Sequence, residues 1–172
     1  MKHFRLHSQF LEDLFGPIRL EIVQQGNGLR MVHLRDATGV SRTLGVVQFY
    51  GTPPEPFARV HRKILEGSPL GPTLLEAGID FEKRVDSRFR IAMPHWLRRA
   101  FLSGEAHATG VLSDLYIRNP KGGPVWQYAR VLEVIPQEVY AGMALGDLPT
   151  PEPGPEAREL LTYANIKPSY NK

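Results

Sequence analysis

The chain begins with two short segments whose hydrophobic periods differ. Residues 8–15 carry apolar side chains at helical spacing, with Leu11 and Phe15 four positions apart, and a Gly-Pro pair ends the segment. Ser8 is a suitable N-cap for this helix. Residues 18–23 then alternate apolar and charged side chains, which is the pattern of a half-buried strand. We therefore predict a helix followed by a strand.

Two more strands are predicted next, in a meander. Residues 26–28, Gly-Asn-Gly, form a hairpin turn into a strand at residues 29–34. Residues 36–39 turn the chain again, and residues 44–50 form a third strand. The third strand is the most apolar of the three, so we expect it to be central in the sheet.

A proline-rich break precedes a helix through residues 57–65, and a turn containing Pro69, Leu70 and Gly71 follows it. Two glycines and two prolines fix the backbone of residues 64–74 and leave peptide N–H groups free. Such groups beside a helix end suit an anion such as a carboxylate. The alternative interpretation is a helix C-cap followed by a stiff turn.

The second half of the chain adds strands and one helix without regular βαβ alternation. Residues 79–92 form either a strand pair or one irregular strand, and residues 94–101 form a short helix. Residues 107–117 and 125–135 are strands joined by a Gly- and Pro-rich loop. The predicted fold class is α+β, with a mainly antiparallel sheet.

The composition changes near residue 147. Residues 148–155 contain four prolines and read as an extended linker, and a short helix over residues 156–165 is expected to dock back on the domain. We divide the chain into a domain at residues 1–146 and a proline-rich extension at residues 147–172. A protein partner bound through this tail is a possible role that no other sequence feature supports.

Composition narrows the functional classes. The chain has 172 residues, enough for one domain with a real core, and its net charge of +3 is too small to indicate nucleic-acid binding. It has no cysteine, so disulfides, thiolate zinc sites and a cysteine nucleophile are excluded. Neither a long apolar run nor a secretory leader is evident, which predicts a cytoplasmic protein with no membrane partner.

Basic residues are concentrated in one stretch, residues 82–99, where six of them stand against two acidic residues. A solvated basic face is one interpretation. The other is attraction of a small dianionic substrate, with Arg84 or Arg88 as the contact. Aromatic residues are not interleaved as a nucleic-acid stacking platform requires.

Three segments together carry a family resemblance. They are residues 11–22, the strand-turn-strand unit that contains Arg30, and the spacing Leu65-x3-Pro69-Leu70-Gly71-x2-Leu74. In order and spacing they resemble the chorismate pyruvate-lyase superfamily, whose members include the bacterial enzymes that make 4-hydroxybenzoate. The resemblance covers residues 8–76 and, more loosely, the strand that ends at residue 136.

The resemblance implies an antiparallel sheet with helices packed on one face and a ligand enclosed beneath helical flaps. It implies that Arg30 holds a carboxylate, that Leu70, with Gly71 in the same turn, offers backbone N–H groups, and that Glu133 lies over the ring oxygen. An alternative alignment puts Ala129 or Arg130 in the place of Glu133. The family reaction removes pyruvate from chorismate and needs neither a cofactor nor a metal.

Arginine and glutamate also suit carboxylate binding and proton donation for chemical reasons that do not depend on the resemblance. The planar fork of an arginine binds a carboxylate through two charge-assisted hydrogen bonds, although Arg30 is also compatible with a solvent-facing strand position. Glu133, between two apolar residues, is expected to have a raised pKa and to donate a proton; a solvent-facing carboxylate is the alternative. The histidines lack metal-ligand spacing.

The sequence therefore predicts a chorismate lyase-like enzyme that eliminates pyruvate from chorismate or a related carboxylate. The alternative is a non-catalytic domain of the same fold that binds or senses an aromatic carboxylate. In both cases the partner is a small-molecule carboxylate.

Overall fold

The computed structural model describes residues 6–119, 121–143 and 152–167. Its strands are β1 Arg19–Gly26, β2 Leu29–Arg35, β3 Ser41–Phe49, β4 Asp80–Ala92, β5 His107–Arg118 and β6 Val125–Pro136. Its helices are α1 His7–Phe15, α2 Phe57–Leu65, α3 Leu70–Glu76, α4 His95–Phe101, α5 Gln137–Tyr140 and α6 Pro155–Tyr163. None of the described helices is long and apolar enough to span a bilayer.

The six strands form one antiparallel sheet in the order β1-β2-β3-β6-β5-β4. The predicted α+β class and antiparallel sheet are confirmed. The β1–β2 hairpin turns through Asn27 and Gly28, whose φ angles of 52° and 75° are those of a two-residue primed turn. Residues 80–92 are one strand with a register shift between Val85 and Ser87, which decides between the two predicted alternatives.

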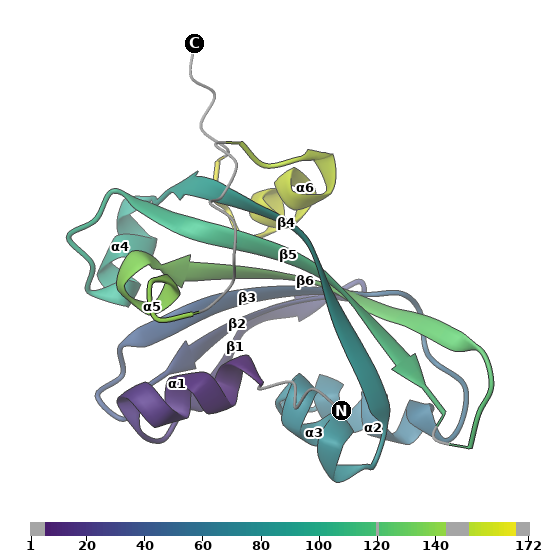
Figure 1. Cartoon of the computed structure of the whole chain (residues 1–172). Coiled ribbons are helices and arrows are strands. Elements are labelled where there is room, and N and C mark those ends of the chain that lie inside the picture. Colours follow the sequence, from purple (N-terminus) through teal and green to yellow (C-terminus); the bar gives the residue numbers. More distant parts are fainter. Residues whose placement is uncertain (1–5, 120, 144–151, 168–172) are drawn as a thin grey trace.

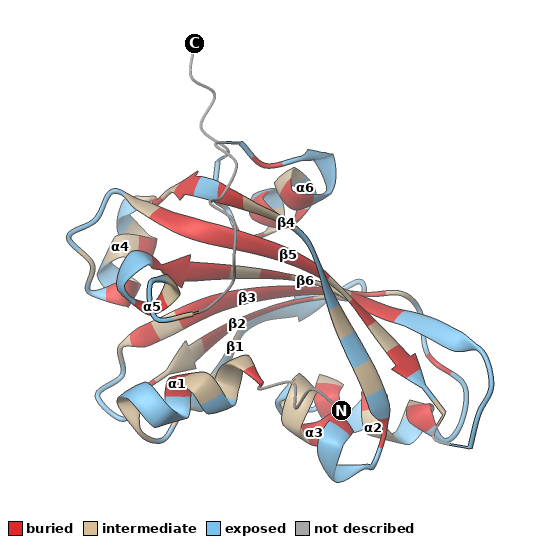
Figure 2. Cartoon of the chain, viewed as in Figure 1, coloured by how far each residue is buried: buried red, intermediate tan, exposed pale blue. Residues whose placement is uncertain are grey.

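The middle strands β3, β6 and β5 are buried on both faces of the sheet (Figure 2). Successive side chains of a strand point to opposite faces. Leu132 and Val134 of β6 therefore face one layer, and Val131, Glu133 and Ile135 face the other. A strand that is apolar at consecutive positions needs cover on both sides.

Helices accordingly lie on both faces, and the expectation that they pack on one face is wrong. Buried side chains of α4 and α6 belong to the same core cluster as Leu132 and Val134. Helices α2 and α3 pack with Ala129, and α1 and α5 pack with Ile135, on the opposite face. Figure 1 shows α1, α2 and α3 on one side of the twisted sheet and α6 on the other.

The helix predicted in the C-terminal extension is present as α6, at Pro155–Tyr163. Its buried side chains Ala157, Leu160 and Leu161 pack into the core cluster of the sheet. Proline at the first helical position suits an N-terminus, where its missing N–H has no intrahelical partner to lose. The first part of the predicted linker, residues 148–151, lies outside the described residues.

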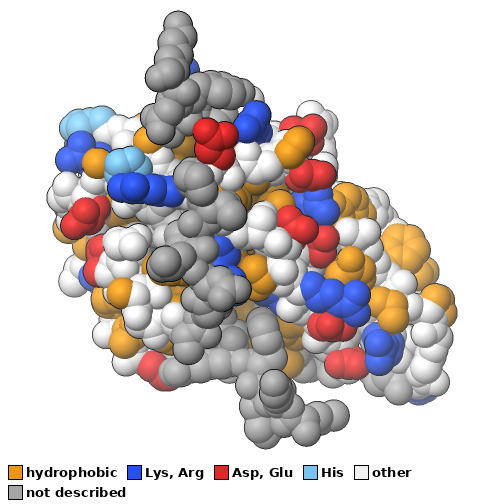
Figure 3. Space-filling model, turned by 45° about the horizontal axis from the view of Figure 1, so that its top comes forward, with side chains coloured by type: hydrophobic (Ala, Val, Ile, Leu, Met, Phe, Trp, Pro, Cys, Tyr) orange, Lys and Arg blue, Asp and Glu red, His pale blue; other side chains and the backbone are white. Residues whose placement is uncertain are grey.

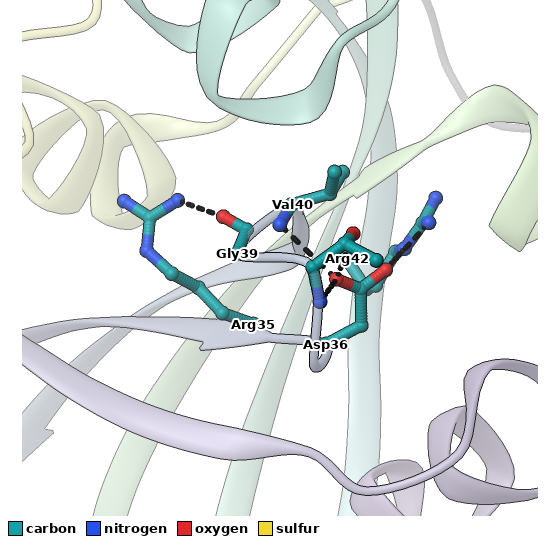
Figure 4. A network of polar contacts seen from close by, with 6 residues as sticks. Arg35, Asp36, Gly39, Val40 and Arg42 are labelled. Atoms are coloured by element: carbon teal, nitrogen blue, oxygen red, sulfur yellow. Dashed lines mark hydrogen bonds and ion pairs between the residues drawn. The ribbon is translucent and has the colours of Figure 1, made fainter.

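The β2–β3 turn is organised by one carboxylate, that of Asp36 (Figure 4). Its Oδ1 accepts hydrogen bonds from the backbone N–H groups of Thr38 at 2.9 Å and Val40 at 3.1 Å. Its Oδ2 accepts from Arg42 Nε at 2.8 Å and Nη2 at 2.6 Å. Burial acts to raise the pKa of Asp36, but the hydrogen bonds from Thr38 and Arg42 outweigh it and lower the pKa to about 2.

The lowered pKa of Asp36 predicts that the free energy of unfolding falls in acid. Because the pKa of Asp36 is lower in the folded chain than its ordinary value, its contribution is complete above pH 4 and is lost as the pH falls toward 2. We expect Asp36→Asn to lower the free energy of unfolding at pH 7 by roughly 1–2 kcal/mol. The deficit should shrink below pH 4 in urea titrations. Asp80→Asn, at an exposed position, is the control; an Asp36→Asn deficit that stays constant with pH would contradict the assignment.

Candidate functional site

A cavity of about 130 Å³ lies between the sheet and the first residues of α1 and α3. One buried water needs roughly 10–15 Å³ on the same measure, so the cavity has room for a small organic molecule. Strands β2, β3 and β6 form its floor, and most of its lining is apolar. In Figure 1 the N-terminal end of α1 points toward α3 on this side of the sheet.

The floor is hollow because its central residue has no side chain. Gly45 lies in the middle of β3, opposite Val32 of β2 on one side and Glu133 of β6 on the other. A Cβ atom added at Gly45 would lie 3.2 Å from Val32 Cγ2. Glycine weakens a strand interior and commonly marks a place that a ligand approaches closely. Gly45 is a candidate site residue that the sequence analysis missed.

The cover of the cavity depends on a second glycine, Gly71. A Cβ atom there would lie 2.8 Å from Leu6 Cδ2, so its absence lets the starts of α1 and α3 meet. The expected turn at Pro69-Leu70-Gly71 is the beginning of α3, with Pro69 as its N-cap. The N–H groups of Leu70 and Gly71 therefore have no partner within the helix, and both residues line the cavity.

Arg30 forms the charged wall beside α3. It is 1% exposed, which rules out the solvent-facing alternative. Its Nη1 donates hydrogen bonds to the carbonyl oxygens of Ile64 at 2.5 Å and Ser68 at 3.4 Å. Its Nε has no partner, and no carboxylate of the described residues forms an ion pair with it. Burial lowers the pKa of the guanidinium, which stays positively charged.

The opposite wall carries an ion pair. Lys83 Nζ of β4 donates to Glu133 Oε2 at 2.6 Å, and both residues line the cavity. Burial acts to raise the pKa of Glu133, but the charge of Lys83 and the hydrogen bond from Lys83 outweigh it, and the pKa is lowered. The expectation of a raised pKa is wrong, because Lys83 was not foreseen as a neighbour.

His7 also lines the cavity, from the first turn of α1. Its Nε2 lies 2.7 Å from Thr43 Oγ1. The Thr43 hydroxyl donates its own proton to the carbonyl oxygen of Arg42 at 2.7 Å, so it accepts from His7 and the proton of the ring is on Nε2. Burial lowers the pKa of His7, against the charge of Glu133, which leaves the ring neutral at neutral pH. No sequence motif marked this residue.

Arg30, Leu70, Gly71 and Glu133 are thus brought together around one cavity. Of the alternatives to Glu133, Ala129 is buried in the apolar core, and Arg130 donates from Nε to Asp114 Oδ1 at 2.8 Å. Neither of them lines the cavity.

Arg84 and Arg88 are not brought to the cavity. Arg84 is exposed, forms an ion pair with Glu82 at 2.8 Å and lies 4.6 Å from the centre of the Tyr116 ring. Arg88 is opposite Val111 in the sheet. Basic and acidic side chains lie next to one another on the face shown in Figure 3. Lys83, one position before Arg84, is the second cation at the cavity.

Comparison of the sequence with protein-family models and with curated proteins finds no match. Within the described part of the chain, no group of three or more acidic or histidine side chains is placed to hold a metal ion.

Arg30 leads to a prediction about stability. A buried cation without a carboxylate partner costs desolvation energy that its hydrogen bonds to carbonyl oxygens only partly offset. We expect Arg30→Met to change the free energy of unfolding in urea by no more than about 1 kcal/mol. Leu11→Ala, which truncates a fully buried side chain, should cost about 2–5 kcal/mol in the same assay. An equal loss for Arg30→Met would show that Arg30 is retained for stability instead.

Proposed function

We propose that this cavity binds a small aromatic or pre-aromatic carboxylate, and that the chain eliminates pyruvate from chorismate or a related carboxylate to leave a hydroxybenzoate. The observation that carries the proposal is Arg30, a buried guanidinium without an acidic partner among the described residues, at the wall of a largely apolar cavity. Keeping a cation in this position is costly unless an anion joins it.

The carboxylate end of the ligand fits between Arg30 and the start of α3. Arg30 Nε has no partner, and the N–H groups of Leu70 and Gly71 have none within their helix. Charge-assisted hydrogen bonds from a guanidinium and backbone N–H groups are a strong combination for a carboxylate. The same resemblance that singled out Arg30 assigned Leu70 to this end.

The far end of the ligand fits beside Glu133. Arg30 is opposite Val47 in β3, and Val47 is opposite Val131 in β6, so Glu133 stands two strands away and two residues further along. The backbones of β2 and β6 are therefore roughly 10 Å apart. A flat ring lying over Gly45 joins the two ends. The ionised Glu133 is suited to accept a hydrogen bond from a ring hydroxyl.

The elimination asks little of the protein. The ether bond from the ring carbon to the enolpyruvyl oxygen breaks, the neighbouring ring carbon loses a proton, and the ring becomes aromatic. The departing enolpyruvate takes up one proton and becomes pyruvate, so atoms balance without water or a cofactor. The chain's part is to hold both ends of the substrate, exclude water and stabilise charge on the departing oxygen.

A non-catalytic binding or sensing domain is the second candidate, and one observation favours it. The lowered pKa of Glu133, held by Lys83, leaves this carboxylate without a proton to give the departing oxygen. A domain that only binds the hydroxybenzoate has no need of such a proton.

Incubation of the chain with chorismate separates the two candidates. We expect pyruvate and 4-hydroxybenzoate to form in equal amounts, and Arg30→Gln to lower kcat/KM at least 100-fold, because a charge-assisted pair is worth about 3 kcal/mol. Arg84→Gln, an exposed arginine outside the cavity, is the matched control and should retain activity. Binding of 4-hydroxybenzoate without turnover would favour the binding domain, and failure to bind either compound would reject both.

The floor of the cavity gives a second test. Gly45→Val places two methyl groups where the ring is proposed to lie, and we expect it to weaken 4-hydroxybenzoate binding more than tenfold in calorimetry. Gly45→Ala should have a smaller effect, because a single Cβ displaces Val32 by only a few tenths of an ångström. Valine suits a strand, so both variants should stay folded in thermal melts. Unchanged affinity in Gly45→Val would place the ring elsewhere.

A further inference from the structure

The charges around the cavity do not match every carboxylate equally well. Among the described residues that line the cavity, four have ionisable side chains: His7, Arg30, Lys83 and Glu133. Lys83 and Glu133 neutralise each other at 2.6 Å, and His7 is neutral, so Arg30 leaves the cavity with one positive charge. A buried site is most stable when its charges are balanced. A ligand with one carboxylate balances it, and a ligand with two carboxylates brings one negative charge too many.

The ion pair shows where a second carboxylate would go. An ammonium group has three N–H donors, and Glu133 Oε2 takes one of those of Lys83. A carboxylate that takes another of these donors is brought close to Glu133. Two carboxylates on one ammonium group repel each other, and such a pair commonly shares one proton.

We propose that the cavity accommodates aromatic ligands with two carboxylates by binding them together with one proton, which is held between Glu133 and the second carboxylate of the ligand beside Lys83. This rests on the proposed function, because Arg30 must hold the first carboxylate. Lys83 is then the residue that holds the second carboxylate. The proton that arrives with the ligand lies beside the second carboxylate, where the departing enolpyruvate needs one.

The groups that face Glu133 favour this arrangement over one in which another side chain takes the proton. His7 of α1 has its Nε2 hydrogen-bonded to Thr43, and its Nδ1 is shielded from solvent. Arg30 of β2 carries a guanidinium, which does not give up its proton in proteins. Lys83 of β4 donates to Glu133 at 2.6 Å. Arg88 of β4 is opposite Val111, which is itself opposite Glu133. β3 contributes Gly45, which has no side chain to titrate.

The test compares a dianion with a monoanion. The dianion is 3-(carboxymethoxy)-4-hydroxybenzoate, a stable aromatic compound whose two carboxylates are placed as in chorismate, and the monoanion is 4-hydroxybenzoate. Calorimetry at pH 7.5 in two buffers of different ionisation enthalpy counts the protons taken up on binding. We expect about one proton per dianion and about none per monoanion. The affinity for the dianion should fall about tenfold for each pH unit above neutrality, while that for the monoanion stays level.

Variants locate the proton. In Glu133→Gln the site has two cations and no acid, so the dianion should bind without proton uptake and more tightly than to the parent at pH 8. Lys83→Met should weaken the dianion at least tenfold and leave the monoanion within threefold. His7→Gln should keep the proton uptake. Thermal melts of all three confirm that they are folded.

The outcomes separate this inference from the function on which it rests. Binding of both ligands with no proton uptake, or loss of the uptake in His7→Gln in place of Glu133→Gln, overturns the inference and leaves the carboxylate site intact. Failure of both ligands to bind overturns the proposed function and the inference together.

Discussion

The hydrogen bonds from the buried guanidinium of Arg30 to the end of α2 set the position of the wall of the cavity beside α3. Through the carbonyl oxygens of Ile64 and Ser68, they fasten the end of α2 to strand β2. Ser68 is directly followed by Pro69, the N-cap of α3, so the same contacts fix where α3 begins. The guanidinium of Arg30 lies between the carbonyl oxygens at the end of α2 and the free N–H groups at the start of α3. The carbonyl oxygens carry partial negative charge and the N–H groups partial positive charge. Arg30 thus both sets the position of the start of α3 and supplies the positive charge at the cavity.

The two faces of the sheet differ in how their apolar side chains are packed. On one face, α4 and α6 pack into a continuous apolar cluster with β3, β5 and β6. On the other face, the apolar packing is divided between two clusters, one under α2 and α3 and one under α1 and α5. The cavity lies on this second face, where Gly45 leaves the strands uncovered and Gly71 lets two helix starts meet above it. The continuous apolar cluster therefore lies on one face of the sheet and the cavity on the other.

Local pattern foretold most of the strands and helices, because alternation and turn residues act over a few positions. The family resemblance named Arg30, Leu70 and Glu133, and all three line the cavity. The sequence-based predictions failed where contacts between segments far apart in the chain determine which side chains line the cavity. The side chain at the cavity is Lys83 and not Arg84, and a single position along an edge strand separates a wall of the cavity from open solvent. The pKa of Glu133 depends on that same lysine, fifty residues away in the chain. The apolar run of β6 needs cover on both faces of the sheet, which the expectation of helices on one face did not take into account.

The position of Lys83 in the sheet has a mechanical consequence. Strand β4 is at the edge of the sheet, so the backbone around Lys83 is hydrogen-bonded to β5 alone, and its register shifts only two residues further on. Arg30, in contrast, extends from a strand with neighbours on both sides. The wall of the cavity at β2 is therefore held by hydrogen bonds from two neighbouring strands, and the wall at β4 from one. In the proposed complex, a change in the length of the ligand would be met by movement of β4, while its carboxylate would stay beside Arg30 of β2.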